Sequence, residues 1–239
     1  DYNLEPELYS FHILNAFETF LEKEGLNGYP VHLKIDTGMH RLGFTKDELP
    51  QLCRQLQNNQ HFFIQSVFSH LAASEDIAED AFTMQQAKLF EDACNTIQQQ
   101  TGQVFMRHLN NSSGILRHPR LQYEMVRLGI GMYGITSSNR ETHSLAETLT
   151  LKTTIAQIKH LPPGETVGYN RKGKINKPSV IATVRIGYAD GYPRNLSNGK
   201  GYMLVKGKPT PVIGIISMDM TMLDITGIAD VSEGDDVLV

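Results

Sequence analysis

Residues 30–43 read PVHLKIDTGMHRLG, and this stretch decides the fold class. The side chains of residues 30–36 alternate between an apolar and a polar face of an expected strand, with Val31, Leu33 and Ile35 opposite His32, Lys34 and Asp36. A polar strand face is unusual in a doubly wound sheet, because helices cover both of its faces. It is typical of a βα barrel, whose active residues lie at the carboxyl ends of the strands. The stretch therefore favours a barrel.

Outward from this stretch, segments of strand and helix pattern alternate as far as residue 147. Strands are expected at 30–36, 61–70 and 104–109 with an extended stretch at 126–130, and helices at 8–21, 46–58, 77–100 and 113–117. This alternation predicts βα units on a parallel sheet. Because a complete barrel runs to ~250 residues, or roughly 30 per unit, residues 1–147 would hold about five units of a partial TIM-type barrel.

From residue 148 onward, strand patterns separated by turns dominate. The expected strands are 149–159, 180–186, 201–206, 210–216 and 221–225. Clusters of Pro, Gly and Asn between them mark the turns. Residues 148–239 therefore predict a C-terminal, mainly antiparallel β domain that is incomplete.

Charge and composition limit the kinds of partner. The chain has 22 basic and 26 acidic residues, a net charge of −4, so no basic excess favours nucleic acid. No apolar run approaches the ~20 residues of a membrane helix, and no secretory signal opens the sequence. Cys53 and Cys94 are typical of small buried hydrophobic residues in a reducing cytoplasm. We expect a cytoplasmic protein that acts on a small molecule, without nucleic-acid or membrane partners.

The segment Asp36-Thr37-Gly38 admits two other interpretations. It could belong to an aspartic protease, with Asp224-Ile225-Thr226-Gly227 as the second lobe. We reject this, because Lys34 on the same strand face would oppose a carboxylate pair that shares a proton. The second copy also lacks a Thr next to its Asp. An ordinary strand-to-helix turn with an Asp cap remains open.

Three further polar features follow strands. His70 ends one strand and could be catalytic or a structural hydrogen bonder. Residues 111–114, Asn-Ser-Ser-Gly, could form an anion site at a helix start or an ordinary N-cap. Arg127 lies among apolar neighbours, and a buried Arg requires a partner. No Cys or His has metal-ligand spacing, so we expect no metal.

Taken together, seven segments follow the order and nearly the spacing of one family: Lys34–Gly43, His70, Asn111-Ser112, Arg127–Gly134, Val167–Asn170, Gly187–Gly191 and Ser217–Asp219. Over nearly its whole length the chain resembles alanine racemase, an isomerase that uses pyridoxal 5'-phosphate. The resemblance implies an N-terminal barrel, a β domain, and a homodimer whose active site is shared between subunits. It also implies interconversion of L- and D-alanine through a cofactor aldimine by two-base proton transfer, which supplies D-alanine for peptidoglycan in the cell wall.

The resemblance assigns cofactor contacts to Asn111, Ser112, Arg127, Gly129 and Ile130. Ser112, Gly129 and Ile130 would hold the phosphate, and Arg127 would face the pyridine nitrogen. An Arg does not give up its proton, so it should leave that nitrogen unprotonated.

The resemblance also assigns roles in catalysis and substrate binding. Tyr169, from the partner subunit, would take the α-proton on the L-alanine side. His70, hydrogen-bonded between Tyr169 and Arg127, would help it lose its own proton. Arg41 would orient this tyrosine and the substrate carboxylate, and Lys34 matches a lysine that some members carbamylate.

The remaining substrate contacts would lie at the entrance. There, Tyr188 would be the gate residue, and Met218 and Asp219 would form the partner-side wall.

Two family residues have no match. The lysine that forms the aldimine lies upstream of Lys34 in the family, where only Lys23 is found, in a helical stretch. A late phosphate-binding tyrosine would lie beyond Val239. With Asp1 rather than Met at its start, the chain is therefore expected to be a central part of the enzyme, inactive alone. Alternatives are a non-catalytic pyridoxal-phosphate-binding barrel protein, which lacks the β domain, and a racemase for another amino acid.

Overall fold

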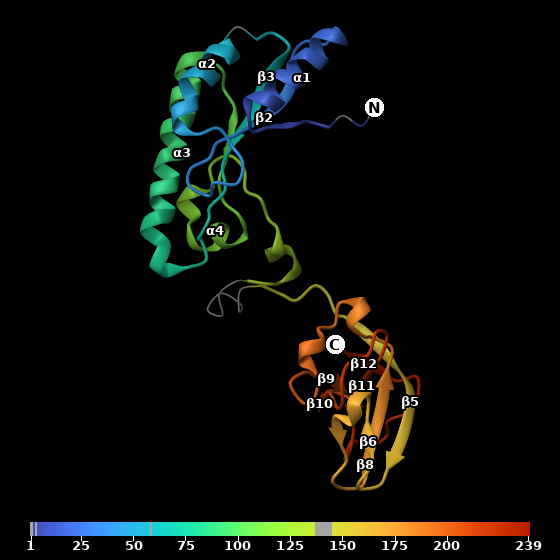
Figure 1. Cartoon of the computed structure of the whole chain (residues 1–239). Helices are drawn as coiled ribbons and strands as arrows, with labels where there is room; N and C mark the ends of the chain where they lie inside the picture. Colours follow the sequence, from blue (N-terminus) through green and yellow to red (C-terminus); the bar gives the residue numbers. More distant parts are fainter. Residues whose placement is uncertain (1, 3, 58, 137–144) are drawn as a thin grey trace. The chain divides into compact units, whose positions relative to one another are not determined.

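The computed structural model describes residues 2, 4–57, 59–136 and 145–239. The chain forms two compact units that divide after residue 148 (Figure 1). Each unit has a hydrophobic core of its own. Among the described residues, no helix is both long and apolar enough to cross a membrane.

The first unit alternates strands and helices along the chain. Its elements are β1 (Glu7–Leu8), α1 (Phe11–Lys23), β2 (Tyr29–Lys34), α2 (Leu49–Gln57), β3 (Phe62–Phe68), α3 (Asp80–Thr101), β4 (Met106–His108) and α4 (Ser112–Arg117). The strands form a parallel sheet in the order β1-β2-β3-β4. Single 3-10 turns precede α2 (η1, Lys46–Glu48) and α3 (η2, Ile77–Glu79), and two more follow α4 (η3, Pro119–Leu121; η4, Ile130–Tyr133).

Capping residues in the sequence determine where these helices begin and end. Ser10 caps α1, where its side chain accepts a hydrogen bond from the N–H of Ile13. Gly102 ends α3 at φ +68°, a left-handed conformation that favours glycine. The apolar faces of the helices and of β2 and β3 share one buried core that includes Leu14, Leu33 and Phe90.

The other face of the β1-β2-β3-β4 sheet, opposite the apolar core, is polar. His32 on β2 pairs in register with Ser66 on β3, because a bulge after Val31 shifts the register of the two strands. The side chain of Ser66 is hydrogen-bonded to both His32 and His108, so the three share this face. A parallel sheet with helices on one face and polar contacts on the other confirms the partial barrel fold.

Three details of the first unit add to or differ from the expected strands and helices. Four strands are described where about five barrel units were expected. The stretch 126–130, expected to be extended, lies in none of the described strands; the N–H of Arg127 donates to the carbonyl of Asn110, 3.0 Å, and Ile130 begins η4. Leu8, placed in the first helix from its spacing, lies in β1.

The second unit is an antiparallel sheet in the order β10-β9-β12-β5-β8-β11, together with the hairpin β6-β7. Its strands are β5 (Lys152–Leu161), β6 (Thr166–Val167), β7 (Gly173–Lys174), β8 (Ser179–Val184), β9 (Tyr202–Val205), β10 (Lys208–Pro211), β11 (Thr221–Asp224) and β12 (Asp236–Leu238). Three 3-10 turns lie between strands: η6 (Tyr169–Arg171), η7 (Tyr188–Asp190) and η8 (Arg194–Leu196). All strand pairs are antiparallel, which confirms the expected β domain.

The expected strand 210–216 is wrong in its second half. β10 ends at Pro211, and Gly214 turns the chain at φ +76°. A Cβ there would lie 2.8 Å from the carbonyl oxygen of Val167, so the close approach of two backbones requires glycine.

Candidate active site

A cavity of about 470 Å³ lies in the first unit, at the carboxyl ends of β2, β3 and β4. Its lining includes six of the residues singled out in the sequence: His70, Asn111, Ser112, Arg127, Gly129 and Ile130. Parallel strands bring their carboxyl ends to one edge, which is why residues 40 to 60 positions apart meet there. The volume lies within the range of ~300–1,000 Å³ that is typical of small-molecule sites.

Arg127 is the central donor of the cavity. Its Nη2 donates to the carbonyl oxygens of Ser69 (2.6 Å) and Leu109 (3.2 Å), and its Nη1 donates to the carbonyl oxygen of His108 (3.2 Å). These bonds hold the ends of β3 and β4 together. Among the described residues, none accepts a hydrogen bond from the Nε–H of Arg127. That N–H is therefore available to a ligand acceptor.

A one-directional chain of hydrogen bonds leads from Arg127 to the surface. Arg127 is a pure donor, so His108 accepts through Nδ1 and carries its proton on Nε2. His108 Nε2 then donates to Ser66 Oγ (2.9 Å), which donates to His32 Nδ1 (2.6 Å). His32 Nε2 donates in turn to a carboxylate oxygen of Glu5 (2.9 Å). The network thus fixes one tautomer for each histidine and holds His108 neutral.

Because of His108, we expect the free energy of unfolding of the first unit to fall at acidic pH. Burial, and then the charge of Arg127, lower the pKa of His108 to about 3. In the unfolded chain a histidine titrates near pH ~6.5, so the unfolded state takes up the proton first. This contribution to the free energy of unfolding is complete above pH ~6.5 and falls towards the folded pKa, by at most about 1.4 kcal/mol per pH unit. Urea unfolding across this pH range, followed by circular dichroism, measures the slope.

The matched variant for this measurement is His108→Gln, which does not titrate. We expect its free energy of unfolding to be lower at neutral pH and to depend less on pH than that of the wild type. An equal pH slope in both proteins would assign the acid sensitivity to other groups.

His70 faces Arg127 from the end of β3. Its Nδ1 lies 3.4 Å from Nη2 of Arg127, so Nδ1 accepts and the proton is on Nε2. Burial, and then the charges of Arg127, Arg41 and Lys34, lower the pKa of His70, whereas Glu75 opposes them. A neutral His70 can therefore donate from Nε2 to a further group.

Ser112 and the chain around Gly129 form a small cradle. Ser112 Oγ accepts hydrogen bonds from the N–H groups of Gly129 (3.0 Å) and Gly131 (3.1 Å), so its own O–H is free to donate. A Cβ on residue 131 would lie only 3.3 Å from the Cβ of Ser112, so the glycine allows the two segments to lie this close. As the first residue of a helical turn, Ile130 has no intrahelical partner for its N–H. This donor set suits an anionic group.

Asn111 has a local structural role as well. Its Oδ1 caps α4 by accepting from the N–H of Gly114 (2.9 Å) and also accepts from Ser74 Oγ (2.8 Å). The N-cap interpretation of Asn111 is therefore correct, while Ser112, the next residue, lines the cavity.

The loop after β2 carries the other predicted residues of this unit. Lys34 Nζ lies 2.8 Å from a carboxylate oxygen of Glu7, and its side chain is 11% exposed. Asp36 accepts from the N–H groups of Gly38 (2.9 Å) and His40 (3.0 Å), so it caps the turn. Arg41 is exposed, and its charge contributes to the lowered pKa of His70.

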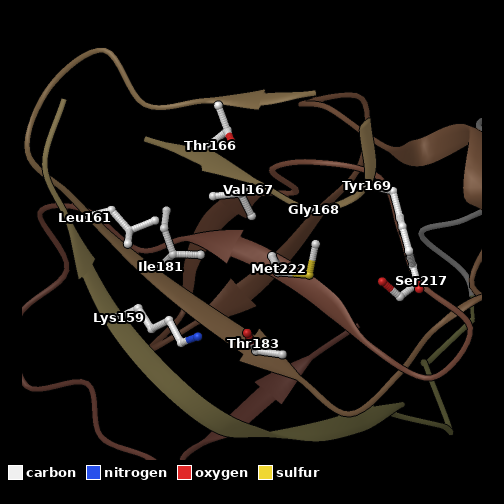
Figure 2. A pocket seen from close by; sticks show the side chains of 10 residues that line it. All are labelled: Lys159, Leu161, Thr166, Val167, Gly168, Tyr169, Ile181, Thr183, Ser217 and Met222. Atoms are coloured by element: carbon white, nitrogen blue, oxygen red, sulfur yellow. The ribbon is translucent and has the colours of Figure 1, made fainter. Parts of the chain in front are cut away.

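In the second unit, Tyr169 lines a separate cavity of about 420 Å³ with Ser217 and Met222 (Figure 2). Tyr169 is 60% exposed and follows Gly168, which turns at φ +74°. Figure 2 shows Tyr169 and Ser217 together at one end, while Lys159 lies at the other.

Backbone hydrogen bonds bring the remaining predicted residues beside this end. The N–H of Tyr188 donates to the carbonyl of Ser217, and that of Ala189 to the carbonyl of Met218 (both 3.0 Å). Tyr188 and Met218 are therefore held on neighbouring turns, and Asp219 is exposed beside them.

The sequence interpretation missed His108 and Glu7. His108 lies at the end of a strand, and His70 follows the end of another. This shared position in the sequence could have indicated His108 as a site residue. Glu7 lies on a two-residue strand that no periodicity reveals. Within the described part of the chain, no group of three His, Cys, Asp or Glu side chains could hold a metal ion.

Known proteins match both units. The family model "Alanine racemase, N-terminal domain" matches residues 1–137, and "Alanine racemase, C-terminal domain" matches residues 148–239. Alanine racemase 1 of Clostridium acetobutylicum is 34% identical over the whole chain, and the alanine racemase of Clostridium tetani is 35% identical. The chain spans 62% of the length of each of these two relatives.

Solved structures agree with the family models. An alanine racemase of Clostridium difficile 630 matches 98% of this chain with a TM-score of 0.89 and 29% identity, and 61% of that protein is covered. The Bartonella henselae alanine racemase with covalently bound pyridoxal phosphate matches 99% with a TM-score of 0.85 and 29% identity, and 64% of it is covered.

Proposed function

Because this chain belongs to the alanine racemase family, we propose that the whole protein interconverts L- and D-alanine with pyridoxal 5'-phosphate. The observation that carries the proposal is the donor set of the first cavity. The Ser112 hydroxyl and the N–H of Ile130 suit the cofactor phosphate, and the Nε–H of Arg127 suits the pyridine nitrogen. When bound, the cofactor supplies a conjugated ring that accepts the electron pair left by the α-proton.

Arg127 would hold the pyridine nitrogen by donation without protonating it, because a guanidinium keeps its proton. An unprotonated pyridine nitrogen would make the ring a weaker electron acceptor. This would favour return of the proton to the same carbon over side reactions.

We further propose that Tyr169 of a second copy of this chain meets His70 and acts as the base on the L-alanine side. His70 donates from Nε2, so it would stabilise a phenolate oxygen placed beside it. Arg41 would hold the substrate carboxylate, with Tyr188, Met218 and Asp219 at the entrance. The protein would then be a homodimer with a shared active site, and its D-alanine would serve peptidoglycan synthesis. A cytoplasmic location agrees with the free, buried Cys53 and Cys94.

A coupled assay tests this function. The whole protein is incubated with pyridoxal phosphate and L-alanine, and D-alanine is detected by D-amino-acid oxidase. We expect D-alanine to form and to be oxidised until the L-alanine is used up. Cofactor binding without turnover would instead favour a binding protein, and faster racemisation of another amino acid would favour the racemase alternative.

The contact between Lys34 and Glu7 predicts that Lys34 is not carbamylated. Lys34 Nζ forms an ion pair with Glu7 at 2.8 Å, and a carbamate on that nitrogen would remove the pair. A carbamate would also place a second negative charge beside Glu7. We expect no carbamate carbon signal in ¹³C NMR of the protein in labelled bicarbonate. A signal that disappears in Lys34→Ala would contradict this.

A further inference from the structure

One polar side chain is completely buried between α3 and the strand-end loops. Gln86 is 0% exposed. Its Oε1 accepts from the N–H of Ala72 (2.9 Å), and its Nε2 donates to the carbonyl of His70 (3.1 Å) and to Thr37 Oγ1 (3.3 Å). Both N–H groups of the amide and one oxygen lone pair are thus used, and water does not compete for them.

These contacts join two loops that carry site residues. Thr37 Oγ1 also contacts Ser69 Oγ (2.8 Å), and both residues are buried. The loop after β2, which contains Thr37, leads to Arg41, and the loop after β3 contains Ser69 and His70. Gln86 therefore connects both loops to the N-terminal third of a 22-residue helix.

The backbone of His70 is held on both sides. Gln86 binds the carbonyl of His70 and the N–H of Ala72, while Arg127 binds the carbonyl of Ser69 (2.6 Å). These bonds fix the position of the His70 backbone, from which its imidazole extends towards Arg127. Replacing a buried amide leaves unpaired backbone groups, which favours local rearrangement and entry of water.

We propose that Gln86 is a positioning residue, which sets the His70 imidazole against Arg127 and fixes the loop of Arg41. It touches neither substrate nor cofactor in this role. The role in turnover rests on the proposed racemase function, whereas the placement of His70 can be measured without activity.

The test compares Gln86→Met with Gln85→Met in the whole protein. Gln85 is the next residue of α3 and is exposed, so its variant controls for the helix and the side-chain type. In Gln86→Met we expect kcat for alanine to fall about 10- to 100-fold, as for a misplaced catalytic group, with KM nearly unchanged. Gln85→Met should behave as the wild type.

The second readout is the titration of His70, followed by NMR with labelled histidine and assigned with His70→Gln. Burial is the main cause of the lowered pKa of His70, so a loosened loop should raise that pKa in Gln86→Met. Thr37→Val removes the hydroxyl that contacts both Gln86 and Ser69, and it should raise the pKa of His70 by a smaller amount. It also serves as the test if Gln86→Met does not fold.

An unchanged His70 titration in a folded Gln86→Met, or in Thr37→Val if only that variant folds, would overturn the proposal and leave Gln86 a structural role. If the wild type proves inactive on alanine, the racemase function fails, but the His70 titration still decides the positioning role.

Discussion

Replacing Tyr169 with Phe is expected to lower racemase activity of the whole protein by about 100- to 10,000-fold, the usual contribution of a general acid or base. The variant removes one oxygen from an exposed side chain, so the fold should be unaffected. Because Tyr169 is proposed to act on the L-alanine side alone, the loss should be asymmetric. Exchange of the α-hydrogen of L-alanine with D₂O, followed by ¹H NMR, should be almost abolished, while exchange of D-alanine is retained in part.

The matched control is Tyr202→Phe. Tyr202 lies on β9 of the same unit and is 65% exposed, but it lines neither cavity. We expect its activity to equal that of the wild type. Equal exchange of both enantiomers in Tyr169→Phe, at the wild-type rate, would remove this tyrosine from the mechanism.

The second large effect concerns stability. Arg127→Met should lower the free energy of unfolding by about 3 kcal/mol or more, because each buried carbonyl that loses its donor costs about 1–3 kcal/mol. The variant leaves the carbonyls of Ser69, His108 and Leu109 without their guanidinium donor. Arg127→Lys should recover part of this loss, because an ammonium keeps the charge but not the planar fork. Urea unfolding by circular dichroism measures all three proteins.

Arg107→Met is the control for Arg127→Met. Arg107 also belongs to the end of β4, but its ion pair with Glu124 is solvent-exposed on both sides. Such pairs contribute ~0–1 kcal/mol. If both Arg variants lost similar stability, the carbonyl contacts of Arg127 would not be the stabilising element proposed.

Much of the fold could be predicted from local patterns. The alternation of residues 30–36 indicated a strand with a polar face, and β2 has this character with His32 and Lys34 opposite a buried Leu33. Long helices such as α3 were evident from their apolar periodicity. Short elements were not: β1 and β12 have two and three residues, too few for a period to emerge.

The sequence indicated which residues form the site, but not the hydrogen bonds that join them. Motif order indicated His70, Ser112 and Arg127, and the structure places all three around one cavity. Nothing in the sequence indicated Gln86, because a single Gln within a helical stripe looks like a surface residue. Tyr169, Tyr188 and Met218 lie in the second unit, and their role at the first cavity is a proposal.

The sequence by itself determined the longer helices and strands and which polar residues follow the strands, because these depend on spacing along the chain. Only the tertiary structure decided their partners. Arg127 binds a carbonyl 58 residues away, and Lys34 pairs with Glu7 at a separation of 27. Such contacts depend on strand order and on the bulge between β2 and β3, since a one-residue shift of register would turn Ser66 away from His32.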